Sequence, residues 1–244
     1  LDFARKFRVT RLPDGDEYLR FTVPERIQHA TMAVSFIVLA YSGFSLKFPG
    51  AWWAAPFVWL GYGEEGRRLV HRIAAVAMVA VCLYHILYLL LSRRGRRGLV
   101  DMLPRLKDIR DAILMVRYYL GLAKDHPHFA RFSYIEKAEY WALAWGSVIM
   151  TVTGFALWFE NTSLRLIPKW GLDVATAIHY YEAWLAVLAI VVWHFYWVIF
   201  NPKMYPMSLV WLTGRMSEEQ MAEEHPLELD EIRRGSDEDG QSGR

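Results

Sequence analysis

The stretch HRIAAVAMVAVCLYH, residues 71–85, decides the fold, because it is an apolar segment that carries a histidine at each end. Apart from the histidines, its one charge-bearing side chain is Arg72. The pattern returns as HYYEAWLAVLAIVVWH at residues 179–194. A polar imidazole in an apolar helix is costly unless its nitrogens have partners. Two such segments in one chain therefore indicate a chemical role for the histidines.

Four stretches are long and apolar enough to cross a bilayer as helices, which takes about 20 residues each. They are roughly Ile27–Leu46, Leu69–Leu91, Ala138–Trp158 and Val174–Phe200. With 54% hydrophobic residues, the chain is too apolar for an ordinary soluble domain. The sequence therefore predicts an all-α membrane protein built on a bundle of four transmembrane helices.

The basic residues predict how the bundle is oriented. Of the 28 Lys and Arg residues, 22 lie in residues 1–26, 92–137 and 201–244. Cytoplasmic loops are enriched in Lys and Arg, so we expect both termini and the loop 92–137 in the cytoplasm. The predicted parts are a cytoplasmic N-terminal segment (1–26), a four-helix domain (27–200) that includes this loop, and a cytoplasmic C-terminal tail (201–244). The expected location is the cytoplasmic (inner) membrane of a bacterium or archaeon.

The loop 92–137 has a helical pattern of its own. Its apolar residues recur at helical spacing between Leu99 and Leu120, and charged residues occupy the other face. This pattern predicts an amphipathic helix that lies on the membrane surface or docks on the bundle. Membrane lipid is therefore an expected partner, and nucleic acid is not.

The histidine spacing places the rings at two depths. In an α-helix, 14 residues bring His85 within about 40° of His71, and 15 residues bring His194 within about 60° of His179. The two histidines of each helix are roughly 21–22 Å apart along its axis. Facing imidazoles at one depth can bind a haem iron from both sides, because iron takes the lone pair of a neutral ring nitrogen. Two depths therefore predict two stacked haems.

The single cysteine, Cys82, excludes internal disulfides, Cys-ligated zinc and iron–sulfur clusters. The chain has no CxxCH motif for covalent haem attachment, so the predicted haems are of the b type. Arg26, Arg72, Arg93 and Lys137 lie at the ends of spans, where haem propionates would emerge.

Several segments resemble the four-helix dihaem cytochrome b subunits of formate dehydrogenases, nickel–iron hydrogenases and related respiratory complexes. They are ERIQH, SGFSLKFPG, RLVHR, FSYIEKAEYWALAWGSVIMTVTGFALWF, AIHYYEAWLAVLAIVVWHFYWVIF and LTGRMSEEQMAEEHP. The resemblance covers about residues 25–226. It implies a membrane subunit that passes electrons between an outer-face redox partner and menaquinone or ubiquinone.

The resemblance also implies the haem ligands. In this family the haem near the outer surface takes the residues that match His71 and His179, and the cytoplasmic-side haem takes those that match His29 and His194. Two haem b groups are therefore expected. The formate dehydrogenase members space the two span-four histidines one residue closer, and they have no histidine that matches His85.

The cytoplasmic level holds three histidines for one iron. Spacing favours His85 as the partner of His194, and the resemblance favours His29, whose flanking residues match as well. We predict His29 as the ligand, with His85 as the alternative ligand and as a candidate for proton transfer to quinone. The resemblance also places a quinone site where the chain enters span three. The residues predicted for it are Ser133, Tyr134, Glu136 and Lys137, together with His85.

No site for the oxidation of a substrate is recognisable, so the donor or acceptor must belong to a partner, either an outer-face iron–sulfur subunit or a multihaem cytochrome c. The chain would then be the quinone-reactive electron-transfer subunit of an oxidoreductase complex. Two alternatives stay open. One is a proton-relay or transport protein in which Glu182 acts with the histidines, and the other is a haem-free membrane anchor. A visible spectrum of bis-histidine haem separates the first hypothesis from the other two.

Overall fold

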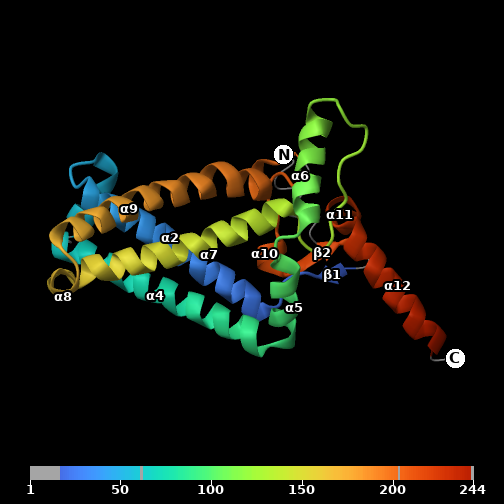
Figure 1. Cartoon of the computed structure of the whole chain (residues 1–244), viewed down its shortest axis with the longest axis horizontal. Coiled ribbons are helices and arrows are strands. Elements are labelled where there is room, and N and C mark those ends of the chain that lie inside the picture. Colours follow the sequence, from blue (N-terminus) through green and yellow to red (C-terminus); the bar gives the residue numbers. More distant parts are fainter. Residues whose placement is uncertain (1–16, 61–62, 203, 243–244) are drawn as a thin grey trace. The chain divides into compact units, whose positions relative to one another are not determined.

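Four long helices correspond to the four apolar stretches (Figure 1). A computed structural model describes residues 17–60, 63–202 and 204–242. The helices are α2 (Val23–Lys47), α4 (Glu64–Leu91), α7 (Tyr134–Trp158) and α9 (Lys169–Leu188), the last continuing as the π-helical segments η2 (Ala189–His194) and η3 (Tyr196–Phe200). All four are long and apolar enough to cross a membrane. The prediction of an all-α protein with four spans is confirmed.

Shorter elements connect the long helices and form the chain ends. Between α2 and α4 lie η1 (Trp52–Ala54) and α3 (Ala55–Trp59), and α8 (Glu160–Leu166) lies between α7 and α9. The remaining elements are β1 (Glu17–Leu19), α5 (Arg93–Met102), α6 (Leu106–Tyr119), α10 (Val210–Thr213), β2 (Arg215–Ser217), α11 (Glu218–Glu224) and α12 (Pro226–Ser242).

The chain divides into two compact units. The bundle unit comprises residues 23–91 and 143–197, and so contains most of the four spans. The terminal unit comprises, among the described residues, 17–22, 92–142, 198–202 and 204–242. The loop 92–137, which the sequence grouped with the four-helix domain, thus clusters with the two chain ends.

In the bundle unit the buried side chains are mostly small or polar. The buried residues of α2 are Gln28, Ser35, Ser42 and Ser45. The first three recur every seven residues and therefore share one helix face. Large apolar side chains such as Ile37, Val76 and Leu188 are exposed instead. This is the reverse of a soluble bundle and suits helices that are surrounded by lipid.

Contacts between side chains define the directions of the helices in the bundle unit. Residues near the end of α2 lie beside the start of α4, and Gln28 near the start of α2 contacts His85 near the end of α4. The helices α2 and α4 are therefore antiparallel. Phe44 of α2 packs on Trp184 of α9, with ring centroids 4.6 Å apart, while His29 lies beside His194. Hence α9 is also antiparallel to α2, and the bundle has two levels of histidines.

The terminal unit has a small core of its own. Strands β1 and β2 pair antiparallel, with Tyr18 opposite Met216. The buried apolar residues of this core come from α10, β2, α11 and α12, and Tyr18 and Phe21 pack against them. They are Val210, Met216, Met221 and Leu229. The N-terminal segment and the tail are therefore folded onto each other in this unit.

The amphipathic stretch of the loop is two helices, where the sequence analysis predicted one. α5 ends at Met102 and α6 begins at Leu106. Pro104 lies between them, and a proline disfavours the helical conformation of the residue before it, here Leu103. The carboxylate of Asp108 then caps α6 by accepting the backbone N–H of Arg105 at 2.6 Å.

Candidate cofactor-binding site

The first pair of histidines joins α4 and α9. The ring centroids of His71 and His179 are 6.4 Å apart, and the ring planes are inclined by 71°. His71 lies two turns from the start of α4, and His179 lies at the middle of α9. The two residues that were predicted to face each other on the sequence pattern are thus brought together.

The second pair joins α2 and η2. The ring centroids of His29 and His194 are 6.5 Å apart, with the planes inclined by 44°. His85, the alternative partner in the sequence analysis, contacts a different residue: its Nδ1 lies 2.8 Å from Oε1 of Gln28. The structure therefore brings His29 to His194 and places the ring of His85 against an amide.

Both ring separations fit an iron atom between two imidazoles. A metal–imidazole bond is about 2 Å long and a ring nitrogen lies about 1.1 Å from its ring centre, which gives about 6.3 Å between the centres of two ligands on one metal. A direct hydrogen bond between ring nitrogens would bring the centres to about 5 Å. The observed distances between ring centroids, 6.4 and 6.5 Å, match two imidazoles bound to one metal ion.

Two arginines beside these pairs have buried groups without partners. Among the described residues, Nε of Arg67 and Nε of Arg26 are buried and make no hydrogen bond. Arg67 lies one turn before His71 on α4, and Arg26 lies one turn before His29 on α2. Arg67 is buried and Arg26 is half-buried. An unpaired N–H of a guanidinium favours an anionic acceptor, and a haem carries two carboxylates. The residues present therefore fit a haem at each level.

The rings of the first pair lie against hydroxyl groups and glycines. Nδ1 of His71 is 3.0 Å from Oγ of Ser42, and Nδ1 of His179 is 2.8 Å from Oγ1 of Thr153. A Cβ atom on Gly43 would lie 3.1 Å from Cε1 of His71. The equivalent atom on Gly154 would lie 3.3 Å from Cε1 of His179. Each ring of the first pair thus contacts a hydroxyl group and lies close to the glycine that follows it in the sequence.

Span four changes helix type just before its second histidine. α9 ends at Leu188, and residues Ala189–His194 form the π-helical η2. A π-turn closes i→i+5 hydrogen bonds and so holds about one residue more than an α-turn. The interval between His179 and His194 thus includes a wider turn, and His194 lies beside His29. The offset of about 60° expected for an unbroken α-helix does not apply.

The residues predicted for quinone form the start of α7. Ser133 and Glu136 make a capping box, in which Oε2 of Glu136 accepts the backbone N–H of Ser133 at 2.7 Å. The ammonium of Lys137 is buried and lies 2.9 Å from a carboxylate oxygen of Asp108 on α6. Tyr134 is half-buried and packs on Phe129. Ser133, Glu136 and Lys137 therefore have structural partners within the terminal unit, whereas His85 belongs to the bundle unit.

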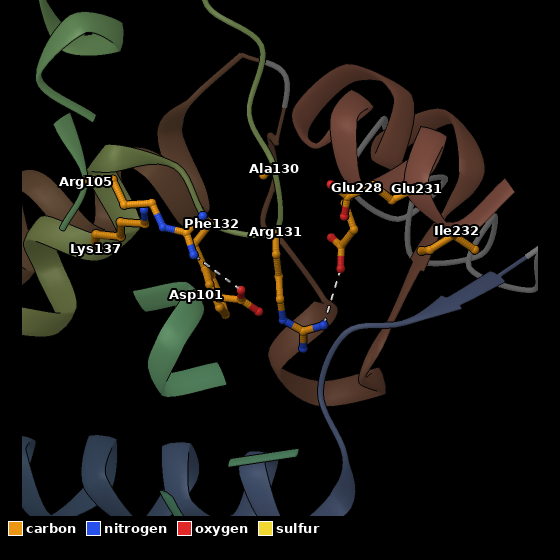
Figure 2. Close-up of a pocket in the computed structure, with 9 residues that line it drawn as sticks. All are labelled: Asp101, Arg105, Ala130, Arg131, Phe132, Lys137, Glu228, Glu231 and Ile232. Carbon is orange, nitrogen blue, oxygen red and sulfur yellow. Dashed lines mark hydrogen bonds and ion pairs between the residues drawn. The ribbon is translucent and has the colours of Figure 1, made fainter. Parts of the chain in front are cut away.

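A cavity of about 360 Å³ opens in the terminal unit around the residues that precede α7 (Figure 2). Its basic residues Arg105, Arg131 and Lys137 each pair with a carboxylate, at 3.9, 3.3 and 2.9 Å. The partners are Asp101, Glu228 and Asp108, respectively. Each of these cations thus has a carboxylate partner, although Nε of Arg131 is buried and makes no hydrogen bond among the described residues.

Glu182, which the sequence analysis named, and two histidines of the loop have local contacts. Oε1 of Glu182 lies against Gly146, where an added Cβ would be only 2.8 Å away. The rings of His126 and His128 are 5.5 Å apart in a segment without regular structure. Within the described ranges, no group of three or more His, Cys, Asp and Glu side chains is arranged to bind a metal ion.

His225 in the C-terminal tail is a buried residue that the sequence pattern did not single out. It is buried, its Nδ1 lies 2.8 Å from the carbonyl of Ala130, and its Nε2 lies 3.1 Å from a guanidinium nitrogen of Arg20. Arg20 also forms a salt bridge with Glu228. Burial, and secondarily the charge of Arg20, lowers the pKa of His225. This cluster connects the N-terminal segment, the loop and the tail.

Ser42, Thr153 and Arg67 were missed as well, although the first two have a signal in the sequence. SGFSL at residues 42–46 and TGFAL at 153–157 are nearly the same motif. Each stands near the end of a span, and the next span contributes the histidine that contacts it. A comparison of spans one and three would have revealed this. Arg67 had no such signal, because its burial depends on tertiary packing.

Comparison with known proteins gives two kinds of match. The model of the family described as prokaryotic cytochrome b561 matches residues 20–209. The cytochrome b556(fdo) subunit of formate dehydrogenase from Escherichia coli strain K12 is 24% identical over 227 residues, covering 90% of this chain and 95% of that subunit. The subunits of the same name from strains O6:H1 and O157:H7 match equally. The range 20–209 includes all four long helices and both histidine pairs.

Proposed function

Since this chain belongs to the prokaryotic cytochrome b561 family, we propose that it is the dihaem, quinone-reactive subunit of a respiratory oxidoreductase complex. The family makes it a multi-pass bacterial membrane protein that binds haem b and takes part in electron transfer. The finer proposal rests on one observation. Two histidine pairs with the ring separation of a bis-histidine iron lie at two levels of the same bundle.

The ligands in this proposal come from three helices. The pairs are His71 with His179 and His29 with His194. A bound haem supplies one-electron redox chemistry, and neutral imidazoles on both sides of its iron keep it low-spin and closed to other ligands. Arg67 and Arg26 would pair with haem carboxylates, which would provide an acceptor for the buried Nε–H of each guanidinium. Two haems at two levels would form an electron path across the membrane.

The orientation is part of the proposal. Of the 28 basic residues, 22 lie in the terminal segments and in the loop 92–137, which favours a cytoplasmic location for all three. The pair His71–His179 would then lie near the outer surface, and the pair His29–His194 near the cytoplasm. Electrons would pass between these two surfaces.

Quinone would react at the cytoplasmic side, beside the start of α7. Of the predicted set, Ser133, Glu136 and Lys137 are occupied by the helix cap and the ion pair. The hydroxyl of Tyr134 makes no hydrogen bond among the described residues, which makes it the group of this set best able to contact a quinone oxygen. His85, held by Gln28, is retained as the candidate for proton transfer.

The redox partner would be an enzyme on the outer face. The Escherichia coli relative is named as a subunit of formate dehydrogenase, and 95% of its length is matched. For this chain we propose a partner of the same class, a redox enzyme that exchanges electrons through an iron–sulfur subunit or a multihaem cytochrome c. The haem nearest that face would be the one at His71–His179.

Haem stoichiometry tests the central claim. The pyridine haemochrome assay on the purified full chain should give two noncovalent haems b per polypeptide. His71→Ala and His194→Ala should each leave one. One haem in the unaltered chain, or none, would overturn the two-level assignment.

Quinone reactivity is tested separately. Tyr134→Phe removes only the hydroxyl, and it should slow the reoxidation of reduced haem by a quinone analogue about fivefold or more, as expected for the loss of a hydrogen bond of about 1 kcal/mol. Tyr181→Phe, in α9 of the bundle unit, is the matched control. Equal rates in both variants would place the quinone site elsewhere.

A further inference from the structure

The two histidines of the pair His71–His179 have matching hydrogen-bond partners on neighbouring helices. Ser42 of α2 lies 3.0 Å from Nδ1 of His71, and Thr153 of α7 lies 2.8 Å from Nδ1 of His179. Both hydroxyl-bearing residues are buried, Ser42 completely. Water is therefore not an alternative partner for either hydroxyl. Which group donates in each hydrogen bond is then decided by the neighbouring protein groups.

The backbone decides which group donates. Oγ of Ser42 lies 2.6 Å from the carbonyl oxygen of Val38, and Oγ1 of Thr153 lies 2.7 Å from that of Ile149. A carbonyl oxygen can only accept, so each hydroxyl must donate its single proton to it. With that proton committed, the hydroxyl oxygen can only accept from the imidazole. Nδ1 of both histidines therefore carries the proton.

A proton on Nδ1 leaves the lone pair of each neutral ring on Nε2, the nitrogen that can bind iron. The tautomer required for ligation is thus set by the protein before any haem is bound. The glycine next to each hydroxyl allows the ring to lie close, since a Cβ at Gly43 or Gly154 would press on its Cε1 atom. Hydroxyl and glycine together restrict the rotation of each ring.

We propose that Ser42 and Thr153 are positioning residues that hold His71 and His179 in the iron-binding tautomer and lower the reduction potential of the haem they share. This inference rests on the proposed ligand role of that pair. An N–H that donates to oxygen makes the imidazole a stronger electron donor, which favours the ferric state of the iron. Removing the acceptor should therefore raise the potential of this haem and leave the other haem unchanged.

The test is a spectroelectrochemical titration of the haem-loaded full chain that resolves both haems. Ser42→Ala and Thr153→Val should each shift the midpoint potential of one haem upward, or deplete that haem where the ring loses its position. Thr153→Ser keeps the hydroxyl and should behave like the unaltered chain. The second haem serves as an internal reference in every variant.

Ser45→Ala is the matched control. Ser45 lies on the same helix, is completely buried and donates to the carbonyl of Tyr41 at 2.7 Å, as Ser42 does to Val38. It should leave both potentials unchanged. Unchanged potentials in Ser42→Ala and Thr153→Val, or an equal shift in Ser45→Ala, would overturn the inference. If the unaltered chain bound no haem at His71 and His179, the proposed function itself would fail, a result that the haemochrome assay reveals before any titration.

Discussion

Nδ1 of His85 lies 2.8 Å from Oε1 of Gln28, the residue next to His29. This contact separates the three histidines of one level into a facing pair and a third ring bound to an amide. Gln28 is itself buried and donates to the carbonyl of Pro24 at 3.2 Å, so the position of its amide is defined. The ring of His85 is thereby directed at α2.

Alanine at His29 and alanine at His85 should therefore have different effects. His29→Ala should remove one haem per chain, because His194 loses its facing ligand. His85→Ala should retain both haems and slow quinone reduction. Haem content and the turnover of a quinone analogue measure the two effects. The opposite pattern would make His85 the ligand and would contradict the assignment of His29.

Enlarging the glycines beside the first pair should reduce haem binding. Gly43→Ala and Gly154→Ala would place a methyl group 3.1 and 3.3 Å from the nearest ring carbon, which is closer than ordinary van der Waals contact. Alanine favours a helix by about 1 kcal/mol over glycine, so the helices themselves are not weakened. Each variant should lose part of its haem, and the double variant should lose more. Gly98→Ala, which meets nothing within 4 Å, is the control that should bind haem fully.

The ion pair of Lys137 and Asp108 should stabilise the terminal unit. Their side chains are only 8% and 16% exposed. Lys137→Met should lower the free energy of unfolding by about 3–5 kcal/mol, because it leaves a buried carboxylate without its partner. Changing Asp108 to Leu in the same chain should recover most of this loss. Thermal unfolding in detergent measures both.

An exposed pair provides the comparison for that experiment. Arg68 and Glu64 are 48% and 61% exposed. Arg68→Met should therefore cost less than about 1 kcal/mol. Equal losses for the two pairs would show that burial adds nothing to the interaction of Lys137 with Asp108.

The cluster around His225 should make the tail sensitive to acid. The ring faces the guanidinium of Arg20 and the carboxylates of Glu228 and Glu136, and burial lowers its pKa below the ordinary value of 6.5. Below pH 6.5 the unfolded chain takes up a proton that the folded chain does not. Stability is thus retained above that pH and lost as the pH falls, by up to about 1.4 kcal/mol per pH unit.

Amide hydrogen exchange of α11 measures this loss. Exchange should accelerate as the pH is lowered from 7 to 5, after correction for the intrinsic rate. His225→Gln should remove the pH dependence, and His128→Gln, in the loop, should preserve it. A tail that responds to pH equally in both variants would exclude His225 as the titrating group.

The spans were predictable because length and hydropathy alone define them. The family resemblance is confirmed by the match over residues 20–209. Each helix begins about a turn earlier than predicted, since polar first-turn residues such as Glu64 and Lys169 continue a helix that an apolar window cannot detect. The break at Pro104 was overlooked, although a proline in an amphipathic pattern is a standard signal for it.

The partners of the predicted ligands could not be read from sequence spacing. The spacing of histidines within span two and within span four placed His85 and His194 at one depth. The choice between His85 and His29 as the partner of His194 depends on how α2 and α4 are rotated about their own axes. Contacts in the terminal unit were equally hidden: Arg20 and Glu228 are separated by 208 positions, and nothing local in either segment indicates the other. Such pairs are determined by tertiary packing alone.

The π-helical segment before His194 separates two properties that are usually linked, the number of residues in a span and the direction of its ligand. An α-helix that gains one residue rotates everything after it by about 100°. Here the extra residue is taken up by a wider turn, so the helix can tolerate an insertion or a deletion while the imidazole keeps its partner. Under the proposed ligand assignment, a difference of one residue in the histidine spacing of span four would leave the imidazole beside the same partner, and a search for ligands in further family members should allow that interval to vary by one.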